Sequence, residues 1–198
     1  CIRKDQRGLE LRRIDLGQVR WEGCEKPRIF GISAGLGLDA LVCKKALNSR
    51  LKQVLNRFHL GKLTYLALTV QSLFTMETAN GKVITEHGGY ILPKMIFAAA
   101  MNLPAEGGGV PMAPDAKNDD GLLSVIFVED IPKKKMPQML LRLLLKKHKK
   151  IQGLRLKDTK SVRIHSDTPL VVHSDGEFCG YRTDIRFEAE KGKLRILC

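Results

Sequence analysis

The segment from Asn102 to Leu122 reads Asn-Leu-Pro-Ala-Glu-Gly-Gly-Gly-Val-Pro-Met-Ala-Pro-Asp-Ala-Lys-Asn-Asp-Asp-Gly-Leu and separates two apolar runs. Its three consecutive glycines, Gly107 to Gly109, can adopt backbone angles closed to other residues and let a ligand approach the main chain closely. Asp120 followed by Gly121 places a carboxylate on a tight turn. Long loops ordered by proline and glycine are usually functional. We therefore expect this segment to contribute to a binding site.

Outside this loop, short apolar runs at close spacing predict a mainly β domain with two or three helices, a pattern typical of a sandwich. Asp39 is a plausible helix cap, the glycines at 35 and 37 indicate a break, and 79–82 reads as a turn. Residues 1–198 show no linker and read as a single domain. The expected strands are 9–19, 27–33, 83–92, 94–101, 122–128, 161–165, 170–173, 181–188 and 193–197, and the expected helices are 39–58, 63–74 and 132–151.

The amino-acid composition indicates which classes of binding partner and which cellular compartment to expect. The net charge of +13 predicts an affinity for polyanions such as anionic membrane, nucleic acid or phosphorylated ligands. Five scattered cysteines without a C-x-x-C pair indicate free thiols in a reducing cytosol. The longest uncharged run, 63–76, has 14 residues, fewer than the roughly 18 that a spanning helix needs. We expect a cytoplasmic protein, soluble or peripheral at the membrane.

Three motifs in order carry a family resemblance. Phe30-x-x-Ser33-x-Gly35-x-Gly37-x-Asp39-Ala40 comes first, then Gly-Gly-Gly, Ala-Pro-Asp-Ala and Asp-Asp-Gly-Leu within 107–122, then Ser-Asp-Gly-Glu at 174–177. This series resembles the C-terminal domain of the diacylglycerol kinase-like lipid kinases, which include bacterial diacylglycerol kinases and sphingosine kinases. Ser33 stands where that family usually has Asn. The resemblance spans 9–197 and implies the β-sandwich second domain of the NAD kinase/diacylglycerol kinase-like architecture.

The resemblance also implies an activity, the transfer of the γ-phosphoryl group of ATP, with Mg²⁺, to a lipid hydroxyl. Glu177 would be the general base, and Asp175, Gly176 and Glu177 would contact the nucleotide and its metal. A structural Mg²⁺ would be held by the Asp120 carboxylate with the carbonyls of Lys117 and Leu122. The family's N-terminal domain carries a Gly-Gly-Asp-Gly-Thr phosphate loop, which this chain lacks. We expect a fragment that needs that missing domain and is inactive alone.

Some alternative interpretations of these motifs remain open, and others are excluded by the sequence. The turn at Asp120 and the one at 174–177 are each also explained as plain structural turns. A Rossmann site at Gly35-Leu36-Gly37 lacks the acid expected about 20 residues later, because none lies between Asp39 and Glu77. The acidic loop fails the EF-hand pattern, since Ala116 and Phe127 stand where acids are required. The histidines lack the spacing of a zinc site.

The predicted helix 132–151 is a separate signal. It carries eight Lys or Arg and no acid, so it is suited to an anionic membrane surface, although a core-packing helix with a solvated face explains it equally. Two alternatives to a lipid kinase follow: a non-catalytic basic module for membrane or nucleic acid, and an NAD kinase-like enzyme. One Trp and three Tyr offer little stacking surface, so we expect no nucleic-acid partner. A homodimer is possible, and the lipid is not specified.

Overall fold

The computed structural model describes residues 3–4, 10–47, 61–106 and 109–197. Within these residues ten strands form one antiparallel sheet, with the order β1-β2-β10-β9-β4-β6-β7-β8 and two side pairings, of β3 with β2 and of β5 with both β6 and β9. The strands are β1 Arg3–Lys4, β2 Glu10–Trp21, β3 Arg28–Phe30, β4 Ser33–Gly37, β5 Ala79–Thr85, β6 Gly88–Met101, β7 Leu123–Glu129, β8 Leu154–Thr159, β9 Ser161–Ser174 and β10 Glu177–Leu197.

The sheet curves because β4 and β5 both lie between β6 and β9, one at each end of these long strands. Gly35 pairs with Ala99 of β6 and His173 of β9, whereas Val83 pairs with Tyr90 of β6 and Ile164 of β9. The curved sheet encloses an apolar core whose largest side chains include Phe30, Phe127 and Phe187. This is the predicted mainly β, sandwich-like fold.

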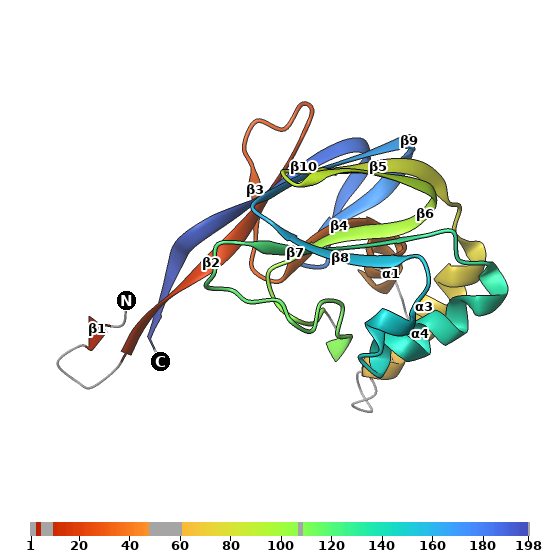
Figure 1. Ribbon diagram of the computed structural model, residues 1–198, viewed down its shortest axis with the longest axis horizontal. Helices are drawn as coiled ribbons and strands as arrows, with labels where there is room; N and C mark the ends of the chain where they lie inside the picture. Colours follow the sequence, from red (N-terminus) through yellow and green to blue (C-terminus); the bar gives the residue numbers. More distant parts are fainter. Residues whose placement is uncertain (1–2, 5–9, 48–60, 107–108, 198) are drawn as a thin grey trace.

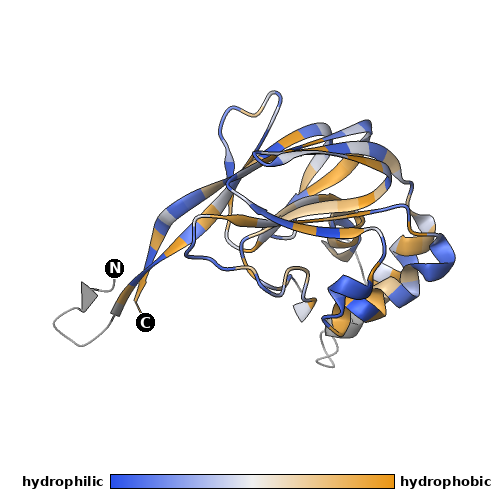
Figure 2. Cartoon of the chain, in the orientation of Figure 1, coloured by the Kyte–Doolittle hydropathy of each residue, from blue (hydrophilic) through white to orange (hydrophobic). Residues whose placement is uncertain are grey.

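The helices lie toward the right of Figure 1, with α3 and α4 together at the lower right and α1 nearer the middle, next to β4. They are α1 Leu38–Leu47, α3 Gly61–Thr75 and α4 Met136–Leu144, flanked by the short 3-10 helices η2 Lys133–Lys135 and η3 His148–Lys150. They share a second core cluster with the outer face of β6 and β7, including Ile96, Ile126 and Met139. Figure 2 shows α3 and α4 banded in polar and apolar residues, as expected for helices with one buried face.

Several expected elements differ in extent. The glycines at 35 and 37 lie inside β4 rather than breaking the chain, and the predicted turn 79–82 lies inside β5. The runs 161–165 and 170–173 form one strand, β9, and 181–188 and 193–197 form another, β10, with register shifts absorbing the irregular residues. Polar interruptions misled the prediction because a bulged strand stays paired across them.

Helices occur in all three regions where the sequence predicted them, but one of the three is interrupted. Residues 63–74 fall within α3. The predicted helix 39–58 begins with α1, and its remainder from residue 48 lies outside the described residues. The single helix predicted for 132–151 is wrong, since η2, α4 and η3 replace it. Lys146, two residues after the end of α4, has a φ of 56°, a left-handed conformation that a continuing helix does not contain.

Two predictions from the sequence concern the redox state of the cysteines and the presence of a membrane-spanning helix. Cys24 and Cys179 are free thiols, while Cys1 and Cys198 lie outside the described residues. Among the helices that the structure describes, none has the length and apolar character needed to span a bilayer.

Candidate functional site

The Asp175-Gly176 turn joins β9 to β10 and organises the centre of the candidate site. Both residues have positive φ, 48° and 81°, as a two-residue hairpin turn requires. The Asp175 carboxylate accepts three backbone N–H groups, from Gly31 (2.7 Å), Ile32 (2.8 Å) and Ser33 (3.1 Å). The segment that opens β4 is therefore fastened to this turn.

Glu177, the predicted general base, follows the turn as the first residue of β10. Its carboxylate forms an ion pair with the guanidinium of Arg28 in β3, and 68% of its side chain is exposed. This carboxylate beside the turn is therefore reachable from solvent. The predicted site residues Asp175, Gly176 and Glu177 therefore lie at this hairpin, and the structure places Arg28 beside them.

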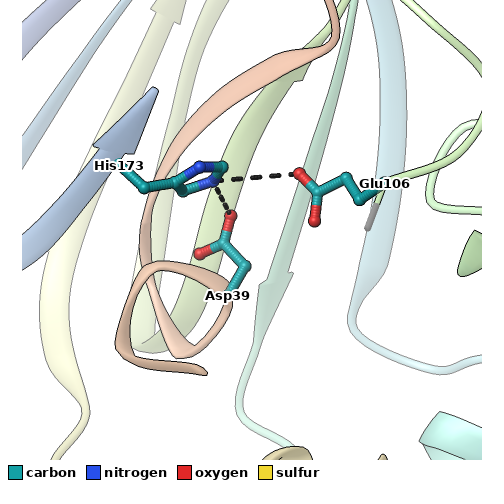
Figure 3. Close-up of side chains that lie close together, drawn as sticks. All are labelled: Asp39, Glu106 and His173. Carbon is teal, nitrogen blue, oxygen red and sulfur yellow. Dashed lines mark hydrogen bonds and ion pairs between the residues drawn. The ribbon is translucent and has the colours of Figure 1, made fainter. Parts of the chain in front are cut away.

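A buried cluster of Asp39, Glu106 and His173 lies next to the turn, with side chains from α1, the glycine loop and β9 pointing toward one another (Figure 3). His173 Nε2 is 3.0 Å from Asp39 Oδ2 and 3.8 Å from Glu106 Oε1. The His173 and Asp39 side chains are 2% and 5% exposed, and that of Glu106 is 14% exposed. Three ionisable groups are thus held away from water.

The neighbours of His173 define its tautomer. The backbone N–H of Gly176 points at Nδ1 (3.3 Å), so Nδ1 acts as an acceptor and the ring proton resides on Nε2, where it is donated to Asp39 Oδ2. Because Gly176 belongs to the turn, His173 connects the buried carboxylates to the hairpin that carries Asp175 and Glu177. It is a positioning residue for that hairpin.

The carboxyl group of Glu106 is pushed toward its neutral form. Burial raises its pKa and the nearby Asp39 and Asp175 charges raise it further, outweighing the opposing effects of His173 and Ser33. Burial lowers the pKa of His173, but the Asp39 charge and hydrogen bond outweigh burial and raise it overall. The Gly176 N–H opposes this rise, because protonation of Nδ1 would turn two N–H groups toward each other.

An apolar pocket of about 180 Å³ opens beside this cluster. Its polar end is formed by Ser33, Asp39, Glu106, His173 and the Asp175-Gly176 turn. The remaining walls come from α1, α3, α4, β6 and the 102–122 loop, and they include Ile32, Leu38, Val42, Phe97, Val110, Met112, Met139, Leu140 and Leu143. A pocket that is apolar along its walls and polar at one end suits an amphipathic ligand.

The motif residues before α1 have a physical role here. A Cβ at Gly35 would collide with Asp39 Oδ2 and would lie 2.8 Å from Ala99 Cβ, so only glycine leaves space for the buried carboxylate. Asp39 is the second residue of α1, and its Oδ1 accepts the N–H of Ala40 (2.7 Å). It was expected as a cap, but its Oδ2 contacts His173 in the candidate site.

The cluster has the residue types of a divalent metal site, with one ligand atom from each residue within 4.8 Å of the others. A metal on Nε2 requires the ring proton to move to Nδ1, where it would face the Gly176 N–H. The Gly176 contact therefore favours a hydrogen-bonded network over a metal centre.

The predicted magnesium ligands lie at the far end of the 102–122 loop from Glu106. Asp120 and Lys117 are exposed, and neither they nor Leu122 lines the pocket. Asp120 Oδ1 accepts the N–H of Leu122 (3.0 Å). The buried Asp15 anchors this loop, because its Oδ2 accepts the Gly121 N–H (2.6 Å) and its N–H donates to the Asn118 carbonyl (2.6 Å). One carboxylate and two carbonyls are hard oxygen donors, which fit Mg²⁺ in chemical type.

Sequence reasoning missed Glu106, His173 and Arg28. Glu106 stands directly before the three glycines, of which Gly107 and Gly108 lie outside the described residues. Its backbone closes the loop, since Glu106 N–H donates to the Val110 carbonyl (3.0 Å) and Gly109 N–H to the Glu106 carbonyl (2.9 Å). An acid placed beside a predicted ligand-binding loop was a usable signal. His173 offered none, because its role depends on pairing between distant strands.

The curated proteins that are similar to this chain carry the names of lipid kinases. The chain is 28% identical over 196 residues to the "Putative lipid kinase YtlR" of Bacillus subtilis, covering 98% of this chain and 63% of that protein. It is 25% identical over 167 residues to a diacylglycerol kinase of Mycobacterium tuberculosis, covering 83% and 50% respectively. The chain thus spans about half to two thirds of the length of these curated relatives.

Solved structures support the same fold. A crystal structure described as a "putative diacylglycerol kinase" from Bacillus anthracis superposes with a TM-score of 0.63 at 18% identity, over 93% of this chain and 57% of that one. At this identity the likeness concerns the fold alone. Residues 32–198 match the family described as "YegS C-terminal NAD kinase beta sandwich-like domain". The chain therefore belongs to this family, the C-terminal domain family of the diacylglycerol kinase-like proteins.

Proposed function

We propose that this chain is the lipid-binding half of an ATP-dependent lipid kinase, which transfers a phosphoryl group to a lipid hydroxyl at the Asp175–Glu177 turn. The observation that supports this best is the position of Asp175 and Gly176 at the polar end of the apolar pocket, directly before Glu177. A lipid whose apolar part enters the pocket would hold its polar end beside the turn. The kinase names of the relatives point to the same reaction class.

Each residue of the turn has a separate task in this proposal. Glu177 accepts the proton of the attacking lipid hydroxyl. The hydroxyl oxygen bonds to the γ-phosphorus of ATP as the bond between that phosphorus and ADP breaks. Asp175, fixed by three N–H groups, and Gly176 hold the turn toward the nucleotide. ATP with Mg²⁺ supplies the phosphoryl group and neutralises its charge, while the walls of the pocket exclude water from the reacting hydroxyl.

The loop of Asp120, Lys117 and Leu122 would hold a second, structural Mg²⁺ in this proposal. Its tethers to the buried Asp15 make it a preformed loop, so an ion there would stabilise the domain rather than react. The exposed lysines that follow α4 would face an anionic membrane, from which the lipid is drawn. Both roles support the transfer without entering the chemical step.

The test needs an ATP-binding domain, which we expect to lie outside this chain. The chain alone should not phosphorylate dioctanoylglycerol with labelled ATP and Mg²⁺. A chimera that joins it to the part of the Bacillus subtilis relative not covered by the match should do so. Activity of the chain alone, or an inactive chimera that binds both ATP and lipid, would contradict the proposal.

A non-catalytic membrane-binding module is the second candidate, favoured by the basic surface after α4. It predicts vesicle binding by the chain with no phosphorylation by the chimera. The NAD kinase-like alternative predicts phosphorylation of NAD rather than of the lipid by that same chimera. One assay with both acceptors separates the three functions.

A further inference from the structure

Glu106 carries a buried oxygen with no hydrogen-bond partner at the polar end of the pocket. Glu106 Oε1 is inaccessible to solvent, and none of the described residues satisfies it. Its separation of 3.8 Å from His173 Nε2 is too long for a hydrogen bond. A polar atom left buried and unsatisfied is unfavourable, and the Glu106 side chain lines the pocket, so a ligand in the pocket that reaches this carboxyl group would supply the missing partner.

The rest of the cluster is already occupied. The Nε2 proton of His173 is donated to Asp39 Oδ2, and its Nδ1 faces the Gly176 N–H. Asp39 Oδ1 accepts the Ala40 N–H. Among the described members of the cluster, Glu106 alone therefore offers a group to a ligand.

The protonation of Glu106 decides what kind of ligand atom it meets. The groups facing it are Asp39 from α1, His173 from β9, Ser33 from β4 and Asp175 from the turn. Burial and the Asp39 charge raise the pKa of Glu106 and so favour its neutral form. A neutral carboxyl group donates one hydrogen bond, and a ligand atom opposite it must accept.

We propose that Glu106 is a specificity-determining residue that donates a hydrogen bond to an ester carbonyl of an acylated glycerol lipid bound in the apolar pocket. This deepens the proposed function and rests on it. The ester carbonyl lies a few bonds from the free hydroxyl of such a lipid. Glu106 shares the polar end of the pocket with Asp175 and Gly176, and Glu177 follows them in the chain, so the carbonyl contact would orient the hydroxyl toward Glu177.

The direct test compares two lipids that differ at the carbonyl. Dioctanoylglycerol has ester carbonyls, whereas dioctylglycerol has ether links at the same positions and the same free hydroxyl. Calorimetry with the 198-residue chain at acidic pH, where Glu106 is neutral, should show about tenfold tighter binding of the ester, the size expected for one buried hydrogen bond. The ester preference should shrink as the pH rises through the pKa of Glu106, because the ionised carboxylate cannot donate.

Two substitutions separate hydrogen bonding from packing. Glu106→Gln keeps the shape and can donate through its amide, so it should retain the ester preference but lose the pH dependence. Glu106→Leu removes the donor, so it should bind the ester and the ether equally. Unchanged circular dichroism spectra of both variants would show that the fold is intact. The comparison of ester and ether binding by the wild-type chain stands even if a variant does not fold.

The outcomes distinguish this inference from the proposed function. Equal binding of ester and ether by the wild-type chain overturns the role of Glu106 and leaves a lipid-binding pocket intact. Binding of neither lipid contradicts the lipid pocket itself and the inference with it. Tighter binding of sphingosine than of dioctanoylglycerol also overturns the inference, because an amine requires an acceptor at Glu106.

Discussion

Glu177 and Arg28 are ion-paired although 149 positions separate them in sequence. The pair lies at the surface, with 39% of the Arg28 side chain and 68% of the Glu177 side chain exposed. Pairs this exposed contribute at most about 1 kcal/mol to stability. The contact matters more for the proposed chemistry, because Arg28 pairs with the carboxylate that would accept the hydroxyl proton. This ion pair must break when the lipid binds.

The first prediction concerns Glu177 in an active chimera of the kind described above. Glu177→Gln preserves the shape and removes the base, so turnover should fall by a factor of about 10²–10⁴. ATP affinity and the melting temperature should change little, because the side chain is mostly exposed. Steady-state phosphorylation of dioctanoylglycerol across pH measures the effect.

Arg28→Gln is the matched control for that prediction, since it breaks the same ion pair and leaves the carboxylate in place. It should retain far more activity than Glu177→Gln. If the two variants lose activity equally, the ion pair itself is what matters. If Glu177→Gln keeps near-normal turnover, the base lies elsewhere.

The second prediction concerns the three N–H groups held by Asp175. Asp175→Asn leaves one acceptor oxygen in place of two and turns an amide toward at least one donor. We expect a loss of about 1–3 kcal/mol in the free energy of unfolding, measured by urea denaturation of the chain. Asp184→Asn provides a control, because Asp184 accepts from the exposed Arg163 side chain and should cost less. Equal effects would contradict a special role for the turn.

Local patterns predicted part of this molecule well. Asp175-Gly176 was identifiable as a hairpin turn because it needs positive φ at both positions, and 94–101 was identifiable as a core strand because its residues are apolar on both faces. The turn was also assigned to the site, although only the family resemblance gave that assignment.

Contacts between segments that lie far apart in the chain could not be predicted from local sequence patterns. Asp39 was interpreted as a helix cap because the chain around it begins a helix, but its contact with His173 depends on β4 pairing with β9. The glycines at 35 and 37 resembled a break for the same reason, since their need for space arises from neighbours in β6 and α1. Local propensity carries no information about such partners.

The third prediction concerns Mg²⁺. If Asp120 binds it with the carbonyls of Lys117 and Leu122, millimolar Mg²⁺ should raise the melting temperature of the chain by mass action. Asp120→Ala should abolish that rise. Asp119→Ala is the control, because the neighbouring Asp119 pairs with Arg12 and its loss should leave the Mg²⁺ effect intact. A melting temperature indifferent to Mg²⁺ in the parent chain would identify a plain turn.

The last prediction concerns the membrane. α4 buries Met136, Met139, Leu140 and Leu143, which leaves Leu141 and Leu145 56% and 53% exposed. Four exposed lysines, Lys146, Lys147, Lys149 and Lys150, follow at once. An apolar ridge beside a cluster of cations suits an anionic bilayer surface, where each charge adds about 1 kcal/mol.

We expect the chain to bind vesicles containing phosphatidylserine and to be released by salt, because screening weakens the attraction. Changing the four lysines after α4 to Gln should reduce binding by at least tenfold. The control changes four exposed lysines elsewhere, Lys26, Lys157, Lys160 and Lys191, and so removes the same net charge. If both quadruple variants weaken binding equally, the attraction comes from the overall charge of +13 and not from this surface. Equal binding to neutral and anionic vesicles would contradict an electrostatic role for the lysines, and tighter binding to RNA than to either would favour a nucleic-acid partner.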